Sequence, residues 1–162
     1  MIRKATQHDL PLIANMNRQG FSGNKPEGMA EKWVSSHFAQ GDQYHYFVFE
    51  QDAKAVGYIS WEVRGGFARG VPIIELDQLG VDENYRGQGI GTMLMSETFE
   101  MMKAWIKQQQ PGAKEMRVMV WCLKGNDKAL AIYEKLCNDG IKGERSIYST
   151  DEVMLRGTYS LE

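Results

Sequence analysis

The sequence predicts a single α/β domain, and three observations support this fold class. Strand and helix patterns alternate in the order β-α-α-β-β-β-α-β-α-β-β, without a linker, an internal repeat or a low-complexity tract. The 162 residues are enough to bury one core. Hydrophobic residues make up 43% and charged residues 25%, as in ordinary globular proteins. We therefore expect residues 1–162 to form one domain.

The first elements are a short strand and two helices. Residues 2–5 read as a strand, and Thr6 with Asp9 resembles a capping box that opens a helix ending near Asn17. The segment Asn17–Gly28 contains three glycines and a proline, which is typical of a loop. A second helix is expected near Met29–Ala39.

Three strands follow. Tyr44–Gln51 and Ala55–Val63 are rich in β-branched and aromatic residues, and the turn Gln51–Lys54 joins them. Three glycines in Arg64–Val71 indicate a hairpin loop. This loop leads into a strand over Ile73–Val81.

The C-terminal half alternates between helices and strands. A helix follows Gly91, and its expected buried stripe is Ile90, Leu94, Thr98, Met101 and Trp105. Pro111-Gly112 ends this helix. The remaining elements are a strand over Met116–Leu123, a helix over Asn126–Leu136, and a closing pair of strands near 141–148 and 153–160.

The most informative stretch is Arg86-Gly87-Gln88-Gly89-Ile90-Gly91, which lies between a strand and a helix. Glycines at alternate positions leave backbone N–H groups unshielded, and the helix macrodipole favours anions there. The loop therefore indicates a diphosphate site. The dinucleotide fingerprint G-x-G-x-x-G does not fit, since the third glycine comes one residue too soon. The Walker loop does not fit either, since no lysine precedes Thr92.

The pattern Arg-x-x-Gly-x-Gly resembles the acyl-CoA pyrophosphate loop of the GNAT (Gcn5-related N-acetyltransferase) superfamily. Residues Asn126–Leu136 resemble a second motif of that family, Asn-x-x-Ala-x-x-x-Tyr-Glu-Lys-Leu. The resemblance implies an α/β (α+β) fold with a mixed, mostly antiparallel sheet of six to seven strands and about four helices. It also implies an N-acetyltransferase that uses acetyl-CoA, with direct attack by a primary amine in a ternary complex.

The same resemblance implies the cofactor-binding residues. In the family, the strand before the loop carries a bulge whose backbone amides contact the thioester and pantetheine, and Leu79-Gly80-Val81 match that segment. The asparagine that opens the last helix also contacts the cofactor. The expected set is Leu79, Gly80, Val81, Arg86, Gly87, Gln88, Gly89, Ile90, Gly91, Thr92, Asn126 and Tyr133.

Acetyl transfer to an amine requires removal of a proton, because a lysine-like amine is neutral only about once in 2,500 molecules at pH 7. Glu75 and Asp77 alternate with apolar neighbours, so both carboxylates should lie on one face of the sheet. Glu75 resembles the general base of the histone-lysine branch. In the ribosomal-protein branch, the base position corresponds to Trp121 here. Two alternatives stay open. The base could be Asp77 or water alone, and Glu75 could be only a solvent-facing charge on the strand.

Tyr133 matches the family tyrosine beside the cofactor sulfur and is the expected general acid. A core aromatic is the alternative, because Ala129, Ile132 and Leu136 share its helical stripe. Asn126 is also expected to be an N-cap. The family usually continues with Gly-Phe, whereas this chain reads Cys137-Asn138-Asp139-Gly140-Ile141.

The acceptor is expected to be a peptide or a small amine with an apolar body. Phe21, Trp33, His37 and the loop Arg64–Val71 match the acceptor groove of the family and contain no acidic cluster. The rival hypothesis is a noncatalytic acyl-CoA sensor or interaction module on the same fold. Thiol release from acetyl-CoA with a panel of amines would separate the two.

Composition limits the partners. The net charge of −2 favours neither nucleic acid nor an anionic membrane, and no apolar run approaches the length of a membrane span. The N-terminus lacks the apolar stretch of a signal peptide, and two cysteines suggest a reducing cytoplasm. His8, His37 and His45 lack ligand spacing, so no metal is expected. We expect a cytoplasmic monomer or homodimer.

Overall fold

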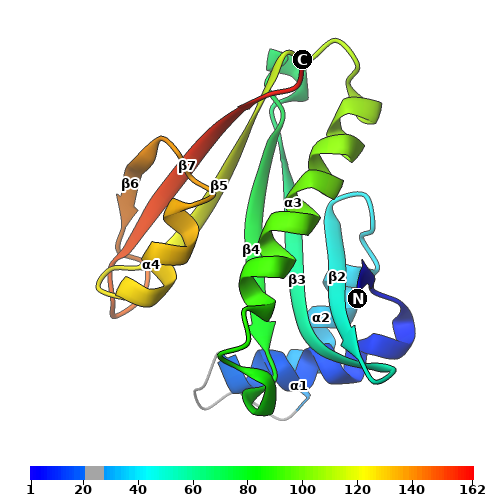
Figure 1. Ribbon diagram of the computed structural model, residues 1–162. Coiled ribbons are helices and arrows are strands. Elements are labelled where there is room, and N and C mark those ends of the chain that lie inside the picture. The colour runs from blue at the N-terminus through cyan, green and yellow to red at the C-terminus, as the bar shows by residue number, and fades with distance from the viewer. Residues whose placement is uncertain (21–27) are drawn as a thin grey trace. The chain divides into compact units, whose positions relative to one another are not determined.

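The computed structural model describes residues 1–20 and 28–162, and its elements follow the predicted order (Figure 1). The helices are α1 (Leu10–Gly20), α2 (Met29–Phe38), α3 (Ile90–Gln109) and α4 (Asp127–Glu134). The strands are β1 (Ile2–Lys4), β2 (Tyr44–Gln51), β3 (Lys54–Gly65), β4 (Ile73–Val81), β5 (Glu115–Leu123), β6 (Gly140–Arg145) and β7 (Glu152–Ser160).

The seven strands form one mixed sheet in the order β1-β2-β3-β4-β5-β7-β6. The pairs β1–β2, β2–β3, β5–β7 and β6–β7 are antiparallel. The pair β4–β5 is parallel, with Glu75 opposite Met119. The predicted mixed, mostly antiparallel sheet flanked by four helices is confirmed.

Backbone contacts divide the described chain into two compact units. The first unit is Met1–Glu62 with Gln78–Phe99. Its sheet is covered on one face by α1 and α2, whose Ile13, Met16 and Val34 are buried in a cluster with Tyr58. The first half of α3 packs on the opposite face.

The second unit is Val63–Asp77 with Glu100–Glu162. In this unit β7 lies between β5 and β6, and α4 packs against β5. The buried face of β5 is formed by every second residue: Met116, Val118, Val120 and Cys122. The alternate face carries Arg117, Met119 and Trp121, which are half-buried.

Two local expectations were wrong. The first helix continues to Gly20 instead of ending near Asn17. The expected stripe of α3 is wrong at Met101, which is 40% exposed. The buried residues of this helix are Ile90, Leu94, Met95, Thr98, Phe99, Met102 and Ile106.

The start of α1 is fixed by a buried carboxylate. Asp9 accepts hydrogen bonds from the Thr6 backbone N–H at 2.7 Å and from two guanidinium nitrogens of Arg3 at 2.8 and 2.9 Å. The hydrogen bonds from Arg3 are the main cause that holds the pKa of Asp9 below its ordinary value. This network ties β1 to the beginning of α1, as the Thr6–Asp9 capping pattern predicted.

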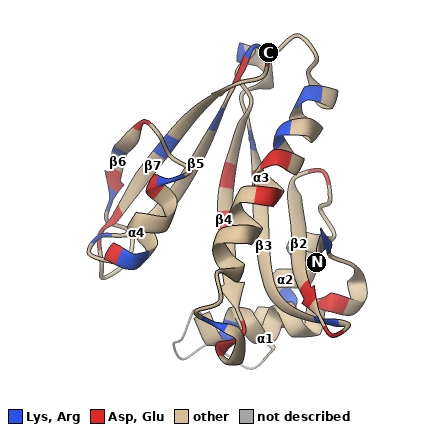
Figure 2. Ribbon diagram, in the orientation of Figure 1, with Lys and Arg blue, Asp and Glu red and all other residues tan. Residues whose placement is uncertain are grey.

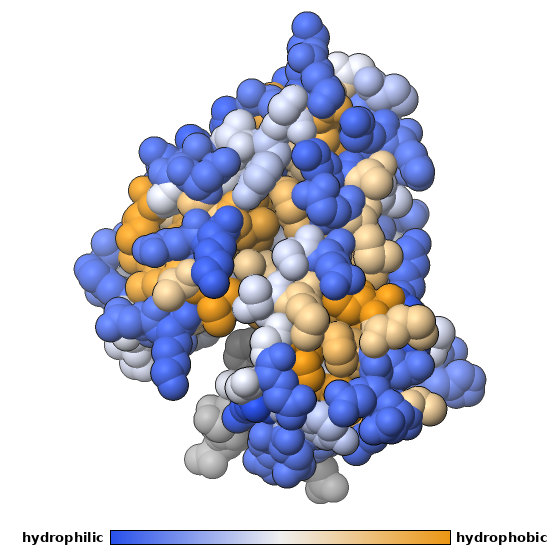
Figure 3. All heavy atoms as spheres, viewed as in Figure 1, coloured by the Kyte–Doolittle hydropathy of each residue, from blue (hydrophilic) through white to orange (hydrophobic). Residues whose placement is uncertain are grey.

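The surface carries mixed charge. Lysine and arginine are interspersed with acidic residues along most elements (Figure 2). Hydrophilic residues cover much of the face seen in Figure 3, with apolar side chains between them. Within residues 1–20 and 28–162, no helix is long and apolar enough to cross a membrane.

Candidate active site

The glycine loop has the conformation of an anion cradle. Gly87 and Gly89 have φ of 77° and 78°, a region that L-residues with side chains rarely adopt. Residues 86–89 are exposed, and α3 begins directly after them at Ile90. The first turn of α3 contains no acidic residue, so its N–H groups and dipole favour an anion. These residues fit the diphosphate of a coenzyme.

Side chains hold this loop to the end of β4. Arg86 donates from Nε to the carbonyl of Val81 at 3.0 Å. The carboxylate of Asp82 is buried and accepts from the backbone N–H of Asn84 at 3.0 Å. Arg86 therefore closes the loop back on the strand, in addition to any contact with a ligand.

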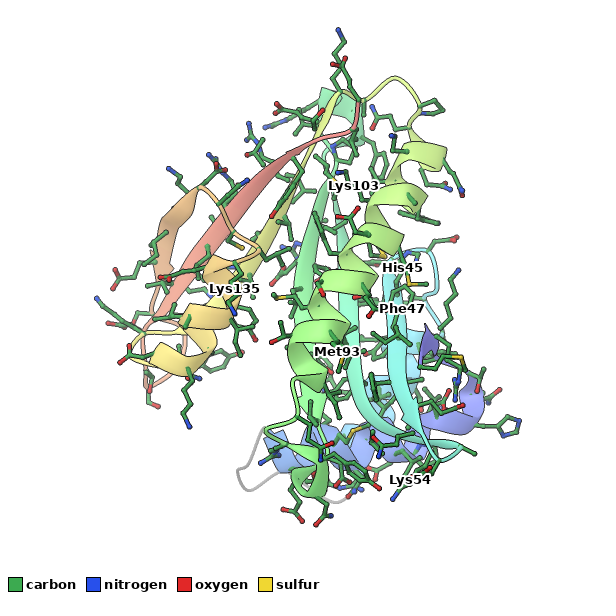
Figure 4. All side chains as sticks on the ribbon, in the orientation of Figure 1. His45, Phe47, Lys54, Met93, Lys103 and Lys135 are labelled. Carbon is green, nitrogen blue, oxygen red and sulfur yellow. The ribbon has the colours of Figure 1, made fainter. Side chains whose placement is uncertain are left out.

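The start of α3 lies unusually close to β3. A Cβ atom at Gly57 would lie 2.8 Å from Cγ2 of Ile90 and 3.1 Å from Cδ1 of Leu94. Only glycine at position 57 permits this approach, which fixes where the helix and its N–H groups begin. Met93, one turn later, is partly exposed on α3 (Figure 4).

Gly80 has a packing role that the sequence did not reveal. A Cβ at this position would lie 2.5 Å from Cε1 of Tyr58, whose ring is fully buried. The absence of a side chain at Gly80 thus admits the Tyr58 ring against β4. Leu79 and Val81 face the other way, since their side chains are the nearest to Gly91 on α3.

Glu75 is not a solvent-facing charge. Its side chain is 13% exposed, and Oε2 lies 3.4 Å from Nε of Arg64 on β3. Ile74 and Leu76 are buried while Glu75 and Asp77 are half-buried, so the two carboxylates share one face as expected. An ionised carboxylate in this position can accept a proton from an amine.

Tyr133 stays protonated over the physiological range. Burial, and then the neighbouring thiols of Cys122 and Cys137, raise the pKa of Tyr133 to about 12. A phenol in this state can donate a proton to a thiolate. Both cysteines are buried, and burial raises the pKa of each thiol, so neither is a thiolate at neutral pH.

The two candidate catalytic groups lie on opposite faces of the sheet in the second unit. Glu75 pairs with Met119 and shares its face. Cys122 lies three residues further along β5 and faces the other side, where it neighbours Tyr133.

Asn126 is the N-cap of α4, as expected, and its side chain accepts from the N–H of Ala129 at 3.3 Å. At the other end, Lys135 directly follows α4 (Figure 4). The Asn126 side chain thus caps the start of the helix that carries Tyr133, and the backbone N–H of Lys135 bonds the carbonyls of Ile132 and Tyr133 at its end.

The atypical segment after α4 is anchored to β7. Asn138 accepts from the N–H of Thr158 at 2.9 Å and donates to its carbonyl at 3.2 Å, which imitates a strand pairing. Asp139 accepts from Arg156 at 2.8 Å and from the Thr158 hydroxyl at 2.7 Å.

Two of the residues expected in the acceptor groove, Trp33 and His37, form an aromatic row with Tyr44 in the first unit. Trp33 is 55% exposed, its ring meets His37 edge-on at 5.2 Å, and His37 stacks on Tyr44 at 4.1 Å. Phe21 lies outside the described residues. His8, His37 and His45 belong to separate elements, with His45 on β2 (Figure 4). Within the described ranges, no group of three or more His, Cys, Asp or Glu residues could hold a metal.

Comparison with known proteins identifies the fold and the family. The model of the acetyltransferase (GNAT) family matches residues 10–138. An N-alpha-acetyltransferase of Sulfurisphaera tokodaii is 28% identical over 157 residues, which cover 93% of this chain and 87% of the relative. The ribosomal-protein-S18-alanine N-acetyltransferase of Escherichia coli has a TM-score of 0.70 at 21% identity, covering 98% of this chain and 92% of its own. The PaiA N-acetyltransferase of Thermoplasma acidophilum, solved with coenzyme A, has a TM-score of 0.63 at 19% identity, covering 98% of both chains. The chain belongs to the GNAT family and is an N-acetyltransferase.

Proposed function

We propose that the chain transfers the acetyl group of acetyl-CoA to the α-amine of a peptide, by direct attack in a ternary complex. The observation that carries the cofactor assignment is the glycine loop at the start of α3, where Gly87 and Gly89 have positive φ and are exposed. The related structure from Thermoplasma acidophilum was solved with coenzyme A, which supports this choice.

The choice of an α-amine rests on similarity and on chemistry. The relative from Sulfurisphaera tokodaii is an N-alpha-acetyltransferase. With a pKa of about 7.8, roughly one α-amine in seven is neutral at pH 7, against about one lysine amine in 2,500. The partly exposed aromatic row of Trp33, His37 and Tyr44 suits a peptide better than a small polycation.

In this proposal the diphosphate binds to residues 86–92. Asn126 is a further contact of the coenzyme, and Tyr133 contacts its sulfur. The backbone N–H groups of Leu79, Gly80 and Val81 take the pantetheine and the thioester oxygen. Donors held in place before the reaction stabilise the charge that develops on that oxygen.

Glu75 removes the proton from the attacking amine, directly or through water. Tyr133 then donates its proton to the departing thiolate of coenzyme A.

The test combines binding and transfer. We expect calorimetry to detect coenzyme A at micromolar to millimolar concentration, and thiol release to require a peptide with an unblocked N-terminus. Glu75→Gln should lower kcat by about 10²-fold or more with little change in coenzyme A binding. Asp77→Asn is the matched control on the same strand face. Absence of coenzyme A binding by folded protein would refute the cofactor assignment, and binding without release would favour a sensor.

A further inference from the structure

We propose that Asn17, Tyr58 and Gln78 form a positioning device that sets the rate of acetyl transfer by fixing the backbone of Leu79–Val81. This inference rests on the proposed function, because it assigns that segment to the thioester. None of the three residues belongs to the motifs that identified the site. All lie in the first unit, on α1, β3 and β4.

The three side chains form a closed triangle of hydrogen bonds. Asn17 donates from Nδ2 to the hydroxyl of Tyr58 and to Oε1 of Gln78, each at 3.2 Å. The Tyr58 hydroxyl donates to the same oxygen at 3.1 Å. Tyr58 is fully buried and Asn17 is 7% exposed, so the loss of a partner would remove a hydrogen bond from a buried polar group.

Tyr58 holds β4 in a second way. Its ring occupies the space that a side chain at Gly80 would need, with Cε1 only 2.5 Å from the Cβ position. Gln78 and Gly80 lie on the same face of β4, because side chains alternate along a strand. Tyr58 therefore contacts both neighbours of Leu79. Its hydroxyl donates to Gln78, and its ring packs against Gly80.

The last turn of α1 contacts both ends of the same segment. Gln19 accepts from the backbone N–H of Glu83 at 3.1 Å, and Asn17 donates to the side chain of Gln78. The segment between Gln78 and Glu83 is thus fixed at both ends by one helical turn. Donors to a developing oxyanion must be placed precisely, since an error of about 1 Å costs about 10²-fold in rate.

The triangle should affect turnover more than cofactor affinity. The diphosphate cradle is formed by Gly87–Gly91 and the first turn of α3, and no hydrogen bond of the triangle is made by these residues. We therefore expect loss of the triangle to lower kcat by at least about tenfold, while the KM for acetyl-CoA changes by less than about threefold.

Three variants and a control test this role with a peptide acceptor. Tyr58→Phe keeps the ring over Gly80 and removes the hydroxyl, and Gln78→Met removes the shared acceptor oxygen. Gln78→Glu keeps an oxygen that accepts from both donors and should retain activity close to wild type. The control Thr98→Val removes another buried hydrogen bond of the first unit, the one from Nε1 of Trp61 at 2.8 Å.

The expected result is a low kcat for Tyr58→Phe and Gln78→Met, and a normal kcat for Gln78→Glu and for Thr98→Val despite a lower Tm. The proposal is wrong if the first two variants keep kcat within twofold of wild type, or if Thr98→Val loses as much. If Gln78→Met does not fold, Tyr58→Phe decides alone. Failure of the proposed function would appear differently, as a wild-type protein without transfer.

Discussion

Substitution of Gly57 by alanine is expected to move the start of α3, against which Gly57 packs, and so to weaken coenzyme A binding. The new Cβ would lie 2.8 Å from Cγ2 of Ile90, whereas ordinary contacts lie at 3.4–4 Å. Ile90 is 3% exposed and branched at Cβ, so its methyl group cannot rotate away cheaply. The helix must therefore withdraw by roughly 1 Å, or the side chain must leave its rotamer.

The magnitude follows from overpacking. An additional methyl group in a packed core costs about 1–3 kcal/mol. For a chain of this length each kcal/mol lowers Tm by about 2–4 °C, so we expect a decrease of about 2–12 °C. Because the N–H groups of the first turn move with Ile90, the dissociation constant of coenzyme A should rise by about tenfold.

Thermal unfolding and calorimetry with coenzyme A measure the two effects. Gly41→Ala is the control, since a Cβ there has no heavy atom within 4 Å. In a double-mutant cycle, Ile90→Ala should remove much of the penalty of Gly57→Ala, because the clashing methyl group is absent. Equal Tm and equal coenzyme A affinity in wild type and Gly57→Ala would refute the reasoning.

Three further outcomes are expected. Tyr133→Phe should lower kcat about 10²-fold at unchanged Tm. Because the pKa of Tyr133 is about 12, the wild-type kcat should show no decline from ionisation of Tyr133 below about pH 11. Asp9→Asn should cost about 2 kcal/mol in urea unfolding at pH 7. This cost should shrink as pH falls below about 3.9, since stability from a lowered pKa is present above the unfolded value and is lost as pH falls through the folded one. Burial raises the pKa of Cys137 to about 12, so folding stability should decline as pH rises from about 9 to 12, and Cys137→Ala should flatten that decline in denaturant unfolding at pH 8 and 10.5.

Strands were the easiest elements to predict, because apolar alternation and turn residues mark both of their ends. Tyr44–Gln51 and Ile73–Val81 agree residue for residue with β2 and β4. The predicted buried stripe of α3 was wrong at Met101, because the buried residue is its neighbour Met102. Hydrophobicity cannot choose between two adjacent methionines, and only the packing of the helix decides which is buried.

Only local features of the candidate site could be predicted from the sequence. Asn126 is the N-cap of α4 and the glycine loop lies between β4 and α3, both as expected, whereas the positive φ of Gly87 and Gly89 was not predicted. The contact between Arg64 and Glu75 and the triangle around Tyr58 were not foreseen. Asn17 and Gln78 are 61 residues apart, and no periodicity or spacing relates them.

The roles of β3 in cofactor binding and in turnover are separable, because two adjacent residues serve them from opposite faces. Gly57 admits the first turn of α3 on one face, and Tyr58 fixes β4 and α1 on the other. Gly57→Ala should therefore raise the KM for acetyl-CoA, whereas Tyr58→Phe should lower kcat. If each residue acts only through its own face, the double variant should show the product of the two effects. A combined effect much smaller than that product, measured by steady-state kinetics, would mean that both substitutions disturb a single element, the backbone of β3 itself.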